Sequence, residues 1–402
     1  MSFSTNSHQT SSLGGLYIHI PYCLSKCNYC DFVSYPLDDR LPIYIDELMK
    51  EMDLRSRDFS ALEIDSIFFG GGTPSLLTAF QLNALLDKIH NTYRIAKNCE
   101  ITIEANPDTI HQSLLMQYKK IGVNRISIGV QALQDSILQN IQRRHNTKQA
   151  IEAIHCAHEA GFSSINCDFM MGLPGETDCS IEEMIQQIAQ LPITHISMYF
   201  LTISRRTPIA RLLRTKKLVV PSEKQAIHHW NQMVKALTGM GFHHYEISNF
   251  AKSSYECRHN LHYWNLDSWA AFGLSSTGFQ MLEPSTKAYR YTNFPSFLQY
   301  TGALSLQKVP TGKAEKLTKK QIEFERNMLH FRLLDVGIPL MSVPKQNRRI
   351  MQEFLAYGWI QFQYKHPFLD PVTGLLYHSP RIVLTEKGVV LSNELITRLL
   401  YS

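Results

Sequence analysis

The sequence has no apolar stretch as long as a membrane-spanning helix needs, and it has no run of lysine and arginine. The first absence argues against an integral membrane protein, and the second argues against nucleic acid as a partner. Residues 1–15 are polar and hold neither an apolar core nor an arginine, so no secretory or mitochondrial address is evident. We therefore expect a cytoplasmic protein with no membrane anchor of its own.

The sequence also lacks the biased composition of a disordered chain. Hydrophobic residues make up 44% of the 402 residues, which is enough for a sizeable core, and the net charge of +5 is a weak bias at that length. The eight cysteines are spaced too unevenly for a disulfide scaffold, because three of them fall within residues 23–30. We interpret four of the others, Cys99, Cys156, Cys167 and Cys179, as small buried apolar residues.

Short apolar runs alternate with longer amphipathic runs between about residues 16 and 199. The predicted strands are 16–20, 64–69, 99–104, 125–128, 164–169 and 195–199, and the predicted helices are 43–55, 81–93, 108–119, 148–160 and 179–190. Such alternation predicts an α/β fold in which βα units surround a parallel sheet. A partial barrel and an open sheet both fit this number of units.

The pattern changes after residue 221, where we expect a smaller α+β domain with winged-helix-like elements. Helices are predicted at 222–240 with Ser222 as N-cap, at 313–334, and at 349–357 before Gly358, and a β-hairpin or wing is predicted at 381–391. The predicted division has a flexible tail over 1–15, a core domain over 16–245, a connecting segment over 246–312 and a C-terminal domain over 313–402.

Polar and glycine residues follow four of the predicted strands. Residues 70–74 read Gly-Gly-Gly-Thr-Pro, and Glu104, Gln131 and Asp168 lie at the ends of the next three strands. Because the carboxyl ends of parallel strands share one face, we expect these residues to line one pocket. Taken singly, the glycines also suit a plain tight turn, and Glu104 also suits a solvated strand-end acid.

Cys23, Cys27 and Cys30 are spaced Cys-x₃-Cys-x₂-Cys directly after the first strand. Several soft thiolates on one short loop favour an iron–sulfur cluster. Zinc and unligated thiols remain alternatives at this point, although a structural zinc site would want a fourth Cys or His nearby. Position 32 is Phe, and His19 lies inside the preceding strand.

Residues 17–32 read Tyr-Ile-His-Ile-Pro-Tyr-Cys-Leu-Ser-Lys-Cys-Asn-Tyr-Cys-Asp-Phe. This stretch resembles the signature of radical S-adenosylmethionine (SAM) proteins. Among these proteins, the chain resembles the oxygen-independent coproporphyrinogen III oxidase group over nearly its whole length. The resemblance implies a partial (β/α)₆ barrel like that of TIM barrels and a C-terminal domain of the oxidase type. It also implies a [4Fe–4S] cluster on Cys23, Cys27 and Cys30, with one iron left open for SAM, whose C–S bond the reduced cluster cleaves.

The same resemblance implies a set of SAM-binding positions. Two of them lie in the signature, three in the glycine loop, and four at later strand ends or in the segment Gln-Arg-Arg-His at 142–145. These residues are Tyr17, Tyr29, Gly71, Gly72, Thr73, Glu104, Gln131, Arg143 and Asp168.

The sequence departs from the oxidase in two ways. The oxidase has a further cysteine two residues after the third, where this chain has Phe32, and it has a longer N-terminal extension than the fifteen or so residues that precede the first strand here. Residues 259–264, His-Asn-Leu-His-Tyr-Trp, instead resemble the hallmark of the haem chaperone branch of the group. For this segment His259, Asn260, Tyr263 and Trp264 are the candidate haem contacts.

Several side chains of this segment could serve haem. His259 or His262 could offer an imidazole to iron, Cys257 could offer a thiolate, and Arg258 could meet a propionate. Histidines and aromatics at such spacings also suit plain packing at a domain junction.

We therefore expect a haem chaperone that carries a [4Fe–4S] cluster and SAM and passes haem to acceptor proteins, membrane-bound acceptors included. The alternative is an oxidoreductase that decarboxylates coproporphyrinogen III in porphyrin biosynthesis. A zinc-binding structural protein is the third hypothesis.

Overall fold

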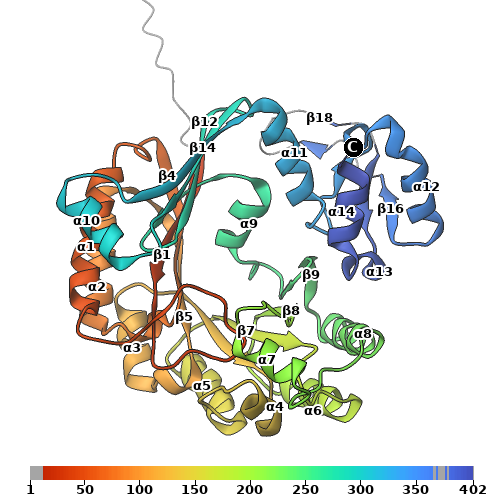
Figure 1. Cartoon of the computed structure of the whole chain (residues 1–402), viewed down its shortest axis with the longest axis horizontal. Coiled ribbons are helices and arrows are strands. Elements are labelled where there is room, and N and C mark those ends of the chain that lie inside the picture. Colours follow the sequence, from red (N-terminus) through yellow and green to blue (C-terminus); the bar gives the residue numbers. More distant parts are fainter. Residues whose placement is uncertain (1–11, 365–367, 370–375, 378–379, 402) are drawn as a thin grey trace, which may run out of the picture.

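The computed structural model describes residues 12–364, 368–369, 376–377 and 380–401. Six parallel strands lie side by side in chain order, as the sequence predicts. They are β1 (Ser12–Ile20), β4 (Leu62–Gly71), β5 (Arg94–Ala105), β6 (Arg125–Gln131), β7 (Ser164–Met171) and β8 (His195–Phe200). Figure 1 shows the sheet curving as a partial barrel, with helices on its outer side.

The sheet extends beyond the six parallel strands at both edges, to twelve strands in all. At one edge β8 pairs with β10 (Asn249–Ala251), which pairs with β9 (His243–Glu246). At the other edge β1 pairs in parallel with β11 (Ser268–Phe272), and an antiparallel series follows through β12 (Thr277–Glu283), β13 (Lys287–Asn293) and β14 (Thr311–Thr318). The predicted boundary between 245 and 246 thus falls inside β9, which is paired with β10, and the domain division stays a prediction.

The helices between the strands bury one face against the sheet. They are α1 (Leu41–Arg55), α2 (Ala79–Thr92), α3 (Gln112–Lys120), α4 (Asp135–Asn140), α5 (Thr147–Glu159), α6 (Asp178–Ile188), α7 (Pro208–Arg214) and α8 (Glu223–Gly239). Reciprocal capping boxes fix several of their starts, including the predicted one at Ser222. The helix predicted at 108–119 begins later, because Pro107 opens a 3₁₀ turn and His111 caps α3.

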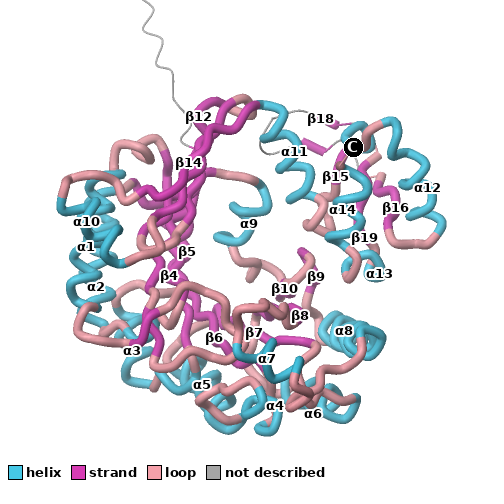
Figure 2. Tube along the Cα trace, viewed as in Figure 1, coloured by secondary structure: helices cyan, strands magenta, loops and turns pink. Residues whose placement is uncertain are grey.

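Helix α9 (Arg258–Asn265) lies on the inner side of the curved sheet, as Figure 2 shows, and packs against β4 and α11 (Lys319–His330). Helix α10 (Phe297–Ser305) covers the outer side next to α1. In the C-terminal part, β15 (Ile338–Pro339), β19 (Arg381–Leu384) and β16 (Ile360–Gln363) form a small antiparallel sheet, with α12 (Arg348–Ala356), α13 (Glu386–Val389) and α14 (Ser392–Leu400) beside it. Two further short strands, β17 (Phe368–Leu369) and β18 (Leu376–Tyr377), pair with each other. This is the α+β arrangement expected for the C-terminal part.

Three predictions of local structure are wrong. The helix predicted at 313–334 is β14 followed by α11, because the segment before Thr318 pairs with β13 and Thr318 then caps the helix. The hairpin predicted at 381–391 is β19 followed by α13, since Thr385 accepts a hydrogen bond from the Gly388 amide and starts a helical turn. Cys179 is exposed in the first turn of α6, and Cys156 is only half-buried.

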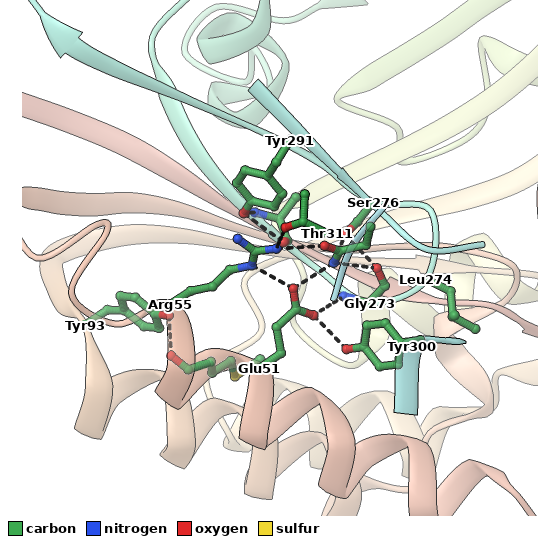
Figure 3. Close-up of polar contacts among 12 residues, drawn as sticks. Glu51, Arg55, Tyr93, Gly273, Leu274, Ser276, Tyr291, Tyr300 and Thr311 are labelled. Atoms are coloured by element: carbon green, nitrogen blue, oxygen red, sulfur yellow. Dashed lines mark hydrogen bonds and ion pairs between the residues drawn. The ribbon is translucent and has the colours of Figure 1, made fainter. Parts of the chain in front are cut away.

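A buried polar network joins α1 to the added strands, by which we mean β11 to β14 at the β1 edge of the sheet (Figure 3). The Glu51 carboxylate accepts hydrogen bonds from Arg55 Nε (2.8 Å), Asn293 Nδ2 (2.7 Å), the Gly273 amide (2.8 Å) and Tyr300 Oη (2.7 Å). The Arg55 guanidinium also lies 3.7 Å from the centre of the Tyr291 ring. These bonds attach the segment after β11 to the first helix of the barrel. Within the described part of the chain, no helix combines the length and apolarity needed to cross a membrane.

Candidate cluster and S-adenosylmethionine site

The three clustered cysteines follow β1 on a loop at the carboxyl ends of the parallel strands. Cys23 lies in the short strand β2 (Tyr22–Cys23), which pairs with β3 (Tyr35–Pro36), and the Cys30 amide donates to the Cys27 carbonyl in a tight turn. All three line one cavity together with residues from five strand ends. The predicted SAM residues at this cavity are Tyr29, Gly71, Gly72, Thr73, Glu104, Gln131, Arg143 and Asp168.

Tyr17 is the one predicted SAM residue that does not line this cavity. Its hydroxyl lies 3.0 Å from His19 Nδ1, and its ring packs against Phe68 and His259 on the inner face of the sheet. Its assignment to SAM stays a prediction, as do those of the other eight residues.

Two side chains place hydrogen-bond donors on the cysteine sulfurs. Thr73 Oγ1 donates to Cys23 Sγ and Arg143 donates to Cys27 Sγ, each at 3.5 Å. The Arg143 guanidinium is held by the Asn106 side chain and the Gly129 carbonyl, whereas neighbouring Arg144 points outward to Asp108. Positive charge and donors beside sulfur stabilise thiolates, which are the ligands of iron–sulfur clusters. The donor set therefore fits the cluster that the sequence predicts.

The spacing of these side chains is less suited to a single metal ion. Nowhere in the described ranges do three His, Cys, Asp or Glu side chains converge closely enough to hold one ion. A four-iron cluster presents its irons at separate corners, so its cysteine ligands lie further apart than those of tetrahedral zinc.

The glycine loop packs its backbone directly against the cysteine loop. A Cβ atom on Gly72 would lie 2.7 Å from the Tyr22 carbonyl oxygen and 3.0 Å from Cys23 Sγ. Gly71 has φ of +118°, a conformation that L side chains rarely adopt. Its amide donates to Glu104 Oε2 at 2.9 Å, which links the loop to the next strand end.

Two half-buried carboxyl groups, Glu104 and Asp168, face the cavity from β5 and β7. Burial, with repulsion from Asp168, raises the pKa of Glu104 to about 8, against the hydrogen bond from Gly71. Burial also raises the pKa of Asp168, although hydrogen bonds from Ser197, Asn166 and Ser127 oppose the shift. The ionised form of such a carboxyl group is stabilised most by a ligand that brings a positive charge or hydroxyl donors into the cavity.

The structure adds residues that are not among the predicted SAM contacts. Asn106, Ser127 and Tyr199 also line the cavity, and Tyr199 donates to Gln131 Oε1 at 3.2 Å. Gln131 itself has a left-handed backbone, with φ of +69° at its strand end. Asn106 and Tyr199 lie at or next to predicted strand ends, so position alone could have indicated them, but Ser127 lies inside a strand.

Helix α9 carries the second predicted site, and its two histidines are already bonded within the protein. The ring nitrogens of His259 contact Ser66 Oγ (2.9 Å) and Tyr263 Oη (2.8 Å). Those of His262 contact Asp65 (2.6 Å) and Asp267 (3.0 Å). Burial lowers the pKa of His262, but the two aspartates outweigh this effect and raise it to about 9.

The other candidate haem contacts of this segment differ in burial and in the side chains that they contact. Asn260 is half-buried, and the Arg332 guanidinium lies 5.8 Å from the centre of the Trp264 ring. Burial raises the pKa of Cys257 to about 12, and its thiol donates to Glu100, so these surroundings disfavour the thiolate. Of the four predicted haem contacts, Tyr263 is the one that lines an apolar cavity, described below.

The partial barrel and the cysteine-lined pocket at its strand ends define a radical SAM protein, and residues 17–188 match the family model of the Radical SAM superfamily. The chain is similar in fold to the solved coproporphyrinogen III oxidase (HemN) from Escherichia coli. The TM-score is 0.77 at 19% identity, over 97% of this chain and 90% of that one.

Curated relatives narrow the assignment further. The heme chaperone HemW of Escherichia coli (strain K12) is 33% identical over 389 residues, which cover 95% of this chain and 96% of the relative. HemW of Mycobacterium tuberculosis (strain H37Rv) is 30% identical over 96% of this chain and 94% of the relative. HemW of Bacillus subtilis (strain 168) is 36% identical over 269 residues, which cover 65% of this chain and 70% of the relative. This chain belongs to the HemW family, which confirms the predicted branch.

Proposed function

We propose that this protein binds haem and passes it to acceptor proteins, and that it carries a [4Fe–4S] cluster and SAM while doing so. The observation that carries this proposal is the 33% identity, over nearly the full length of both chains, to a protein named as a heme chaperone. Phe32 supports the same choice. It is 69% exposed at the edge of the cysteine cavity, at the position where the oxidase has its further cysteine.

The pocket offers each cofactor a suitable set of groups. Cys23, Cys27 and Cys30 would hold the cluster, and Arg143 would offset the negative charge of its thiolates. When bound, the reduced cluster supplies the electron that breaks a C–S bond of SAM. Glu104 lies beside the glycine loop and is placed to accept hydrogen bonds from the amino group or ribose of SAM, which would favour its ionised form.

The proposal extends to partners and location. We expect acceptor proteins that include membrane-bound haem proteins, no nucleic acid partner, and a cytoplasmic site of action. Support for these points comes from the composition and from the name of the relatives.

The test begins with anaerobic reconstitution of the cluster in the full chain. One sample then receives haem, and a second receives coproporphyrinogen III, SAM and a reductant. We expect about one haem retained per chain, transfer to an apo-haem protein, and no protoporphyrinogen IX. Turnover of coproporphyrinogen III would refute the chaperone assignment in favour of the oxidase.

A cluster variant separates the cofactor from the haem function. Cys27→Ser should lose the brown absorbance of the cluster because it removes one of the three thiolate ligands. Cys179→Ser is the matched control, since Cys179 is exposed on α6, away from the cavity. Equal iron content in the two variants would contradict the cluster assignment.

A further inference from the structure

A second cavity, of about 630 Å³, lies between α9 and α11 and is separate from the cysteine-lined pocket. Its lining includes Tyr263 and Trp269 on one side, and Phe324 and Met328 of α11 on the other. The volume falls within the range of cofactor sites, and the lining is mainly apolar, which is typical of such sites. Of the predicted haem contacts on α9, Tyr263 is the one that reaches this cavity.

The aromatic side chains give the cavity flat walls. The Trp269 ring is stacked on Phe279, with ring centres 5.2 Å apart and planes 25° apart. Tyr263 stands edge-on to the same indole ring, at 4.8 Å between centres and 78° between planes. Phe324 is braced in the same way by Tyr401, which also lines the cavity. A planar macrocycle can lie flat against one of these rings, with the perpendicular ring at its edge.

The iron ligand has to come from the cavity wall. Both ring nitrogens of His259 and of His262 already bond to protein partners, and the Cys257 thiol is buried against Glu100. The half-buried thioether of Met328 lines the cavity, and methionine sulfur is an established ligand of haem iron. Among the lining residues it is the soft donor.

A positively charged side chain at the mouth of the cavity suits the anionic propionate edge of a haem. Lys320 lines the cavity and is exposed, so its ammonium group can reach a propionate at the rim. Its neighbour Lys319 does not line the cavity and is paired with Glu323 at 3.8 Å. Arg290 lies at the same rim but is already bonded to Glu315 and Glu325.

We propose that haem binds in this cavity between α9 and α11, against the wall formed by Tyr263 and Trp269, with the Met328 thioether on iron and Lys320 at a propionate. The inference rests on the proposed function and adds the place and the ligand. A neutral thioether binds ferric iron less strongly than a thiolate or phenolate does, which suits a carrier that must release its haem.

The test compares Met328→Leu with Met281→Leu in haem titrations of the full chain. Both changes keep the side-chain volume, and Met281 of β12 lies outside this cavity. We expect Met328→Leu to weaken haem binding at least tenfold and to abolish the sulfur-to-iron charge-transfer band of the ferric complex. Met281→Leu should change neither.

A charge-reversal pair probes the propionate contact. Lys320→Glu should weaken haem binding severalfold more than Lys319→Glu, because the two changes are equal in charge and differ in position. If the native protein binds haem and Met328→Leu keeps both affinity and spectrum, the cavity assignment is overturned while the proposed function stands. If the native protein binds no haem at all, both fail.

Discussion

Replacing Glu51 by glutamine should lower the free energy of unfolding by about 3–5 kcal/mol, the cost of removing one partner from a buried ion pair. Glu51 has no exposed surface and Arg55 is 2% exposed, so water cannot solvate the charge that remains. The four groups around the carboxylate all donate. A glutamine amide offers one oxygen and directs an NH₂ group at two of these donors.

The structure indicates which bonds would survive. The Tyr300 hydroxyl can rotate to accept from the new NH₂ group, but the Gly273 amide cannot, and an unpaired buried amide costs about 1–3 kcal/mol. Arg55 would keep hydrogen bonds to Asn293 and Thr311 but lose its counter-charge. The added strands would then be held less firmly to α1.

Equilibrium urea unfolding of the full chain measures this loss. Glu283→Gln is the control, because Glu283 forms an exposed i,i+4 pair with Lys287, and we expect no measurable change there. In the Glu51→Gln background, Arg55→Met should cost less than it costs alone, since the unpaired charge is then removed. Equal losses from Glu51→Gln and Glu283→Gln, or strict additivity of the double variant, would refute the reasoning.

Two further predictions concern the candidate site. Gly72→Ala should lower the iron content after reconstitution, because the added Cβ would displace the cysteine loop. Gly239→Ala is the control, since a Cβ there meets nothing within 4 Å. Equal iron contents in the two variants would contradict this prediction. In SAM-free protein, Glu104 keeps in the folded state a proton that it loses on unfolding, so stability should fall by roughly 1.4 kcal/mol per pH unit between about pH 4.5 and 8. Glu104→Gln should remove that slope in urea titrations, and parallel pH curves for the two proteins would count against the buried acid.

The alternation of strands and helices in the barrel could be predicted from the sequence because each βα unit carries its own local signals. All six predicted parallel strands are present, and Ser222 caps α8 as predicted. The errors arose where partners distant in sequence decide the structure. The segment before Thr318 has no strong local preference, and its pairing with β13 makes it a strand.

The site shows the same division. Adjacent strand ends in a parallel sheet must share a face, so the meeting of Glu104, Gln131 and Asp168 with the cysteine loop followed from their order in the chain. Ser127 could not be singled out, because its role depends on which face of β6 it occupies and on the neighbours there.

The sequence by itself determined the grouping of the three cysteines on one loop, the glycine loop and the parallel core, because short-range spacing sets all three. It also determined the family, through residues 17–32 and 259–264. Only the tertiary structure decided what the histidines of α9 do. His259 bonds to Ser66 across 193 positions and His262 bonds to Asp65 across 197, and sequence spacing cannot reveal such contacts. Because those bonds occupy both imidazoles, our proposal places haem in the aromatic cavity beside them.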